Sequence, residues 1–169
     1  MKIKIVYLAD YPHLRYSLAE WFMKEWGERY PERTLMDWAN TQTYLNKTKL
    51  PVTLVALANH SNNPNDSSDK EIVGTVCLRE NGMDTHTQWT AWLSYLVIPE
   101  EHRGKGIAKL LLDHAVKVAD MLGLSKLHLF TRLSDQTLYL NKGWEIVGQE
   151  MYRGGIATIM EKQVKLKDN

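Results

Sequence analysis

The chain has 169 residues, of which 44% are hydrophobic and 24% charged, as in an ordinary soluble globular protein. Basic and acidic residues nearly balance at a net charge of +1, which argues against general binding to nucleic acid or to an anionic membrane. The single cysteine, Cys77, excludes an internal disulfide and a thiolate metal cluster, and its apolar surroundings predict a buried thiol. We expect one domain over residues 1–169, without a signal peptide or membrane span, in the cytoplasm.

The first half of the chain shows both strand and helix periodicity. Residues 2–9 alternate and are rich in Ile and Val, which predicts an opening strand. Apolar residues then recur every three or four positions over residues 14–26, as on one face of a helix. The remaining elements predicted here are a shorter helix at 34–45 and two strands at 52–58 and 72–79, with a polar hairpin loop at 59–70 between them.

The second half contains one long amphipathic helix among short strands. The predicted order is a strand at 90–98, a helix at 106–122, a strand at 126–131, a short helix at 134–141, and a hairpin of strands at 144–151 and 156–164. Gly123 is expected to end the long helix and Ser134 to cap the short one. The complete order, β-α-α-β-β-β-α-β-α-β-β, predicts an α/β fold with a mixed, mostly antiparallel sheet and helices on both faces.

A glycine-containing loop lies between the strand at 90–98 and the helix at 106–122. The segment Arg103-Gly104-Lys105-Gly106-Ile107-Ala108 opens directly into the helix. Glycines let the backbone turn its N–H groups inward, and a helix N-terminus has free N–H donors at the positive end of its dipole, so we expect a pyrophosphate site. Two alternatives are a turn that only starts a helix and a dinucleotide-binding turn, although Lys109 follows Ala108 where the latter needs its third glycine.

This loop and its surroundings resemble those of the GCN5-related N-acetyltransferases. The acetyl-coenzyme A loop of that family has the pattern Arg/Gln-x-x-Gly-x-Gly/Ala, which Arg103, Gly106 and Ala108 match. A strand ending Val-x-Pro precedes the loop in the family, as Val97-Ile98-Pro99 does here. The family also often has a Tyr four residues before a Gly-aromatic pair, the spacing from Tyr139 to Gly143-Trp144. The resemblance is specific over residues 93–144.

The resemblance implies a fold, a donor and a binding site. In the family, the strands that correspond to 90–98 and 126–131 splay apart, and the acyl end of acetyl-CoA enters the gap. Backbone N–H groups of Leu96 and Val97 would align the acyl and pantetheine portion, and the loop would hold the pyrophosphate. The implied cofactor-binding residues are Leu96, Val97, Ile98, Arg103, Gly104, Lys105, Gly106, Ile107 and Ala108. The implied reaction uses acetyl-CoA as acyl donor and an amine as acceptor, with no metal.

The resemblance also implies a general acid but gives no clear general base. Tyr139 matches the family's acid, whose phenol O–H is directed at the thiolate sulfur; the alternative is a buried structural aromatic. The family frequently has a Glu in its fourth strand, but residues 89–96 contain no acid. His86 is a candidate base because an unperturbed histidine has a pKa near ~6.5, while Glu80 and Asp84 lie close by in sequence. Each is alternatively a solvated turn residue.

Several features bear on the acceptor without identifying it. Tryptophans at 21, 26 and 38 either line an acceptor groove or belong to the core. Several acidic residues are expected either to attract a cationic amine or only to form the solvent-exposed face of the helices; they lie at positions 20, 25, 28, 32 and 37. The family's Asn before its Tyr is missing; Asp135 and Gln136 stand nearby, with helix capping the simpler role for Asp135. Residues 127–131 with Tyr139 give a weak similarity to members that act on acidic protein amino termini.

Three functional hypotheses follow. The first is direct transfer of an acetyl group from acetyl-CoA to a primary amine, of a small molecule or a protein N-terminus, in a ternary complex. The second is a non-catalytic acyl-CoA-binding sensor or structural domain of the same fold, and the third an unrelated α/β nucleotide binder. Pairing of edge strands into a homodimer stays open.

Overall fold

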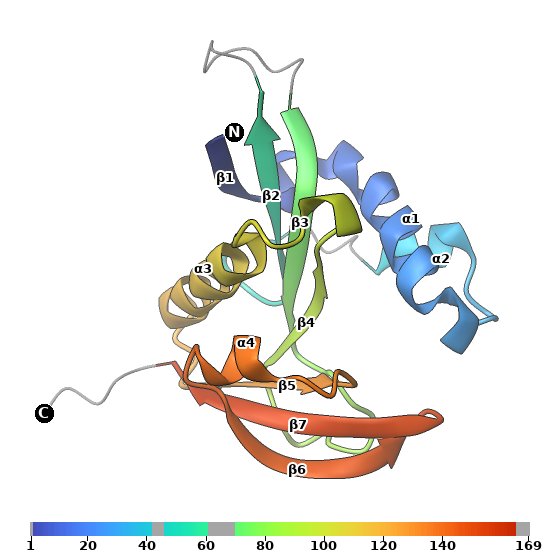
Figure 1. Ribbon diagram of the computed structural model, residues 1–169, viewed down its shortest axis with the longest axis vertical. Helices are drawn as coiled ribbons and strands as arrows, with labels where there is room; N and C mark the ends of the chain where they lie inside the picture. The colour runs from blue at the N-terminus through green and yellow to red at the C-terminus, as the bar shows by residue number, and fades with distance from the viewer. Residues whose placement is uncertain (1, 42–45, 61–69, 165–169) are drawn as a thin grey trace, which may run out of the picture.

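The computed structural model describes residues 2–41, 46–60 and 70–164 and contains a sheet of seven strands in the order β1-β2-β3-β4-β5-β7-β6 (Figure 1). The strands are β1 (Lys2–Tyr7), β2 (Val52–Asn59), β3 (Lys70–Arg79), β4 (Trp92–Val97), β5 (Lys126–Thr131), β6 (Glu145–Tyr152) and β7 (Gly155–Gln163). Only β4 and β5 are parallel among these neighbours. The predicted mixed, mostly antiparallel sheet is therefore confirmed. Figure 1 shows β6 and β7 running across the direction of β2 and β3.

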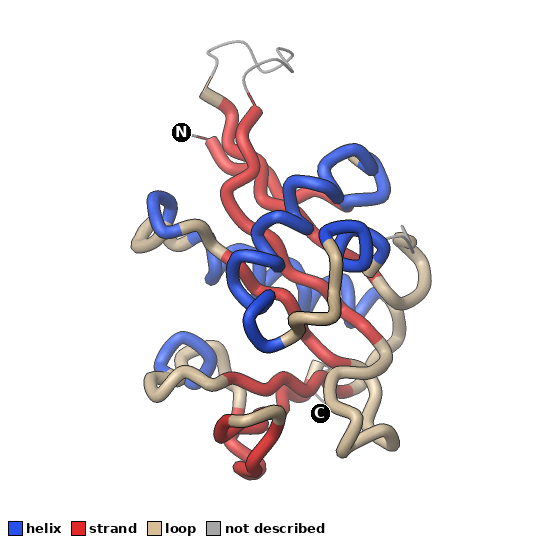
Figure 2. Tube along the Cα trace, turned by 90° about the vertical axis from the view of Figure 1, so that its right-hand side faces the viewer, coloured by secondary structure: helices blue, strands red, loops and turns tan. Residues whose placement is uncertain are grey.

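Helices cover both faces of the sheet, as predicted. The α-helices are α1 (Arg15–Trp26), α2 (Leu35–Asn40), α3 (Ile107–Met121) and α4 (Thr137–Leu140), and the 3-10 turns are η1 (Leu8–Asp10), η2 (Pro12–Leu14), η3 (Gly27–Arg29) and η4 (Glu100–His102). Helix α3 lies on one side of β2 and β3, and α1 and α2 lie on the other (Figure 1). Figure 2 views the molecule from the side of α1 and α2. Within the described residues, no helix has the length and apolar character needed to cross a membrane.

Three hydrophobic clusters hold these layers together. The first lies under α3 and includes Leu111 and Tyr139. The second lies under α1 and α2, around Phe22 and Trp38. The third lies on the same face as the second but farther along the sheet. Trp92 of β4 belongs to the third cluster, whereas the next residue, Leu93, belongs to the first, and successive side chains of a strand point to opposite faces. Cys77 is buried as predicted, and burial raises the pKa of its thiol.

Element boundaries differ from prediction where local chemistry decides them. Helix α2 begins as expected, because Thr34 and Asp37 form a capping box, but it ends at Asn40; positions 42–45 of the predicted helix lie outside the described residues. The centre of the predicted hairpin loop, 61–69, also lies outside them. The predicted cap at Ser134 is wrong: Asp135 Oδ1 accepts the N–H of Thr137 at 2.9 Å, so α4 starts three residues later.

Candidate active site

The parallel strands β4 and β5 separate almost immediately after they meet. Their single paired position is Trp92 with His128, next to a bond in which the N–H of His128 donates to the carbonyl of Ala91 at 2.9 Å. Beyond that point no pairing joins the two strands among the described residues. The splayed gap that the resemblance implied is present, and it opens toward the C-terminal ends of both strands.

A β-bulge in β4 lies beside this gap. Thr75 of β3 faces Val97 whereas Cys77 faces Ser94, so β4 contains one more residue than its partner between these positions. Tyr95, within the bulge, has a φ of 54°, which is uncommon for a residue other than glycine. Such a bulge interrupts the ladder and turns local N–H groups out of register. Leu96 and Val97, the residues expected to align the acyl portion, therefore lie at the bulge.

The glycine loop follows β4 through η4 and enters α3. Gly104 and Gly106 have φ values of 73° and 77°, and an added Cβ at either would meet no atom within 4 Å. Gly106 is the N-cap of α3; no side chain caps this helix, and its first turn holds no acidic residue. The N–H groups of the first turn, Ile107 and Ala108 included, therefore form an uncapped, unobstructed helix start that suits an anion.

Side chains of the loop hold its backbone in shape. Arg103 Nε donates to the carbonyl of Ile98 at 3.1 Å, and Lys105 Nζ donates to the carbonyl of Glu101 at 2.9 Å. His102, in η4, is buried, and its Nε2 lies 3.1 Å from Glu71 Oε1 of β3. Sequence reasoning missed this last contact because Glu71 and His102 are far apart in the chain.

Tyr139 lies on α4 in the cluster under α3. It is 8% exposed, and its ring centre is 6.4 Å from that of Trp144 in an edge-on arrangement. Burial raises the pKa of Tyr139 to about 12, so the phenol keeps its proton at any physiological pH. Tyr139 is therefore a buried aromatic residue with a protonated phenol.

His86 lies on the opposite face of the sheet, in the segment between β3 and β4. Its Nε2 is 2.7 Å from Glu150 Oε2 of β6, and its ring stacks on Trp89 with centroids 4.2 Å apart. The other side of Trp89 stacks on His128 at 4.6 Å. Hydrogen bonds from Thr85 and then from His86 lower the pKa of Glu150. The two sequence-predicted catalytic residues thus lie on different faces of β5 and do not touch.

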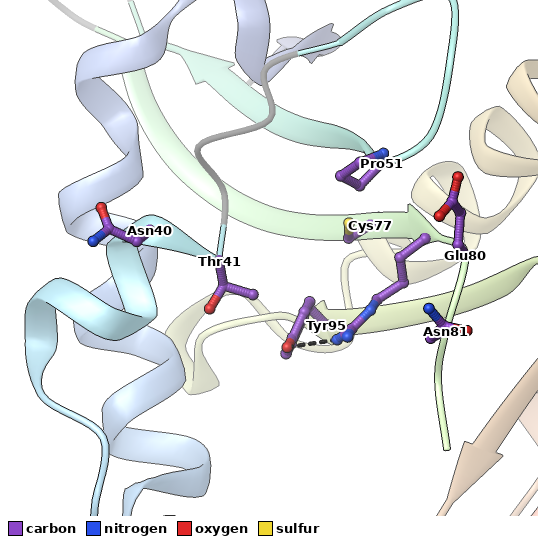
Figure 3. Close-up of a pocket in the computed structure, with 8 residues that line it drawn as sticks. Asn40, Thr41, Pro51, Cys77, Glu80, Asn81 and Tyr95 are labelled. Carbon is purple, nitrogen blue, oxygen red and sulfur yellow. Dashed lines mark hydrogen bonds between the residues drawn. The ribbon is translucent and has the colours of Figure 1, made fainter. Parts of the chain in front are cut away.

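A pocket of about 310 Å³ opens on the face that carries α1 and α2 (Figure 3). Its lining residues are Asn40, Thr41, Pro51, Cys77, Arg79, Glu80, Asn81 and Tyr95. Arg79 Nη1 donates to the hydroxyl of Tyr95 at 2.7 Å, the contact dashed in Figure 3. Tyr95 stacks on Phe22 with centroids 4.9 Å apart. The pocket therefore reaches the bulge of β4 from the side opposite α3.

The residues considered for acceptor binding divide between core and surface. Trp38 is buried in the second cluster, and Trp21 and Trp26 pack against it, with Trp26 5.5 Å from the Tyr95 ring. The acidic residues at 20, 25, 28 and 32 are exposed, and that at 37 serves the cap of α2. Within the described ranges, no three His, Cys, Asp or Glu side chains gather as a metal site would require.

Comparisons with known proteins agree with this arrangement. The model of the acetyltransferase (GNAT) family matches residues 15–139. Among solved structures, an aminoglycoside 6'-acetyltransferase type Ii is 20% identical over 99% of this chain and 100% of that one, with a TM-score of 0.66. An aminoglycoside 6'-N-acetyltransferase complexed with coenzyme A is 18% identical over all of both chains, also at 0.66. Mutant forms of a spermidine/spermine N-acetyltransferase from Vibrio cholerae are 19% identical over 96% and 95%, at 0.59.

These similarities establish a shared fold. A comparison with curated proteins finds no match. The fold, with its split parallel pair, is that of known acetyltransferase structures. Since the family model covers most of its length, the chain belongs to the acetyltransferase (GNAT) family and uses acetyl-CoA.

Proposed function

We propose that this chain transfers the acetyl group of acetyl-CoA directly to a primary amine within a ternary complex. The observation that carries the proposal is the gap between β4 and β5, which has the uncapped start of α3 on one face and the Tyr95 pocket on the other. A donor and an acceptor that arrive from opposite faces can meet at the gap without a covalent enzyme intermediate. Holding both reactants there lowers the entropic part of the barrier.

In this proposal the pyrophosphate binds the loop at 103–108 and the pantetheine portion follows β4. Gly104 and Gly106 leave room for the phosphates, and the N–H groups of the first turn of α3 face them. Backbone N–H groups at Leu96 and Val97 orient and polarise the thioester carbonyl. Arg103 and Lys105, already bound to loop carbonyls, add positive charge.

Tyr139 is the proposed general acid. The neutral amine attacks the thioester carbonyl, and the C–S bond breaks as the tetrahedral intermediate collapses. The departing thiolate takes the phenolic proton of Tyr139, which burial keeps in place. The proton that the amine loses is later returned to the phenolate through solvent, so the tyrosine is regenerated.

His86 is the proposed base that removes the proton of the incoming ammonium, directly or through water. It lies on the acceptor face, and Glu150 fixes its ring. Replacing His86 with Gln is expected to lower kcat about 100-fold, the usual contribution of a general base. His114→Gln, on α3 at the other face, is the control. An unchanged kcat for His86→Gln would remove this residue from the mechanism.

The first test is thermal unfolding with acetyl-CoA, using a nicotinamide dinucleotide as the control ligand, followed by release of CoA with a panel of primary amines. A ligand at 100 times its Kd stabilises the native state by about 2.7 kcal/mol, which corresponds to roughly 5 °C or more in Tm. Stabilisation followed by amine-dependent CoA release supports the transferase. Stabilisation without turnover on any amine favours the alternative, an acyl-CoA sensor. The lack of an acidic residue in β4 supports this alternative.

A further inference from the structure

Three arginines gather where the β6–β7 turn approaches the segment after α1. Arg29 ends η3, Arg132 directly follows β5, and Arg153 lies in the turn. Arg132 Nη2 donates to the carbonyls of Tyr152, at 2.6 Å, and Arg153, at 3.2 Å. The guanidinium of Arg153 lies 5.1 Å from the ring centre of Tyr30, next to Arg29 in the chain. We call Arg29, Arg132 and Arg153 the arginine group.

The positive charge of this group exceeds the negative charge that balances it. Asp84 Oδ2 lies 3.1 Å from Arg153 and is the carboxylate that pairs with the group among the described residues. Arg132 Nε is buried and has no hydrogen-bond partner within the same residues. Burial, followed by the charge of Arg29, lowers the pKa of Arg132. Arg29 and Arg132 are close enough to interact electrostatically, and no carboxylate pairs with either among the described residues, which suits an anion.

The arginine group lies at the open end of the β4–β5 gap. Arg132 follows the last residue of β5, the end at which the two strands have separated. Phe130, two residues earlier, meets Tyr152 edge to face at 5.4 Å in the third cluster, on the face of the sheet opposite α3. The group therefore stands on the acceptor side, away from the helix start assigned to the pyrophosphate.

We propose that the acceptor carries an anionic group, a carboxylate or a phosphate, beside its primary amine, and that Arg132 and Arg29 bind this anion. The proposal rests on the proposed function and specifies its substrate class. It separates this chain from the aminoglycoside and spermidine acetyltransferases that share its fold, because polycationic acceptors would be repelled by the group. Among the described residues, the exposed carboxylates of Glu28 and Glu32 form no ion pair with the arginines and do not neutralise Arg132.

The test compares acceptors that differ only in the anion. Lysine is paired with cadaverine, phenylalanine with phenethylamine, and phosphoethanolamine with ethanolamine, while spermidine and kanamycin represent polycations. Release of CoA is measured at equal concentrations of neutral amine. For either the amino-acid pairs or the phosphate pair, we expect kcat/KM to be at least about tenfold higher for the anionic member. A factor of this size is typical of one hydrogen bond to a charged group. The amino-acid and phosphate arms show which anion is bound.

Charge-removing variants locate the effect. Arg29→Gln is expected to raise KM for the preferred anionic acceptor about tenfold and to leave KM for its partner without the anion unchanged. Lys24→Gln, which removes one exposed charge from α1, is the matched control and should change neither value. A preference for the decarboxylated members or the polycations overturns the proposal and leaves acetyl transfer intact. If no acceptor of any kind releases CoA, the proposed function falls with it.

Discussion

At the scale of single residues, the chemical role proposed for Tyr139 can be tested apart from its structural role. Its ring belongs to the cluster under α3, yet its hydroxyl retains a proton that burial makes hard to lose. Tyr139→Phe keeps the ring and removes the O–H. We expect kcat to fall about 100-fold, because protonation of a leaving group by a positioned acid contributes at least that much. Acetyl-CoA-induced stabilisation should persist, and a wild-type rate in CoA release would refute the proposed acid.

The same residue predicts a pH dependence of stability. The folded-state pKa of Tyr139 is about 12, above the usual value of 10, so the folded protein holds this proton more tightly than the unfolded chain. Its contribution is complete below about pH 10 and is lost as the pH rises toward 12, by up to about 2–3 kcal/mol. Urea unfolding at pH 9 and pH 11.5 measures it. The loss should be smaller in Tyr139→Phe, and equal losses would contradict the prediction.

At the scale of elements, the loop before α3 can be tested with a matched pair of glycines. Gly106 and Gly123 flank α3 with φ values of 77° and 75°, and an added Cβ meets nothing at either. Alanine at either site should lower the stability of the fold by a similar amount, about 1–2 kcal/mol, because the residue has a left-handed conformation. Only Gly106→Ala is expected to raise KM for acetyl-CoA, about tenfold, through a weakened phosphate contact. A similar KM in both variants would argue against this site.

The elements also show what a sequence can predict. Helix α3 and the order of the elements along the chain follow from local patterns, because periodicity and Gly106 are encoded over a few neighbouring residues. The bulge at Tyr95 was not predicted, since no glycine or asparagine marks its positive φ. The arginine group was missed for a different reason: η3, the end of β5 and the β6–β7 turn meet only in the tertiary structure.

At the scale of the whole molecule, the sheet consists of two parts. Strands β1 to β4 pair continuously, as do β5, β7 and β6, but one register position joins the two sets. The first cluster, under α3, adds side-chain contacts from both sets. Most of the backbone hydrogen bonds that a sheet would normally form at this junction are absent among the described residues.

An extended ligand in the gap would complete that junction. Bound acetyl-CoA is expected to slow amide hydrogen exchange in β4 and β5 together, while β1, at the far edge of the sheet, exchanges as before. Exchange measured by mass spectrometry with and without acetyl-CoA checks this, and protection confined to the loop at 103–108 would contradict it. Bound acetyl-CoA would then connect the two sets of strands. Release of CoA after each turnover would restore the motion of one set relative to the other.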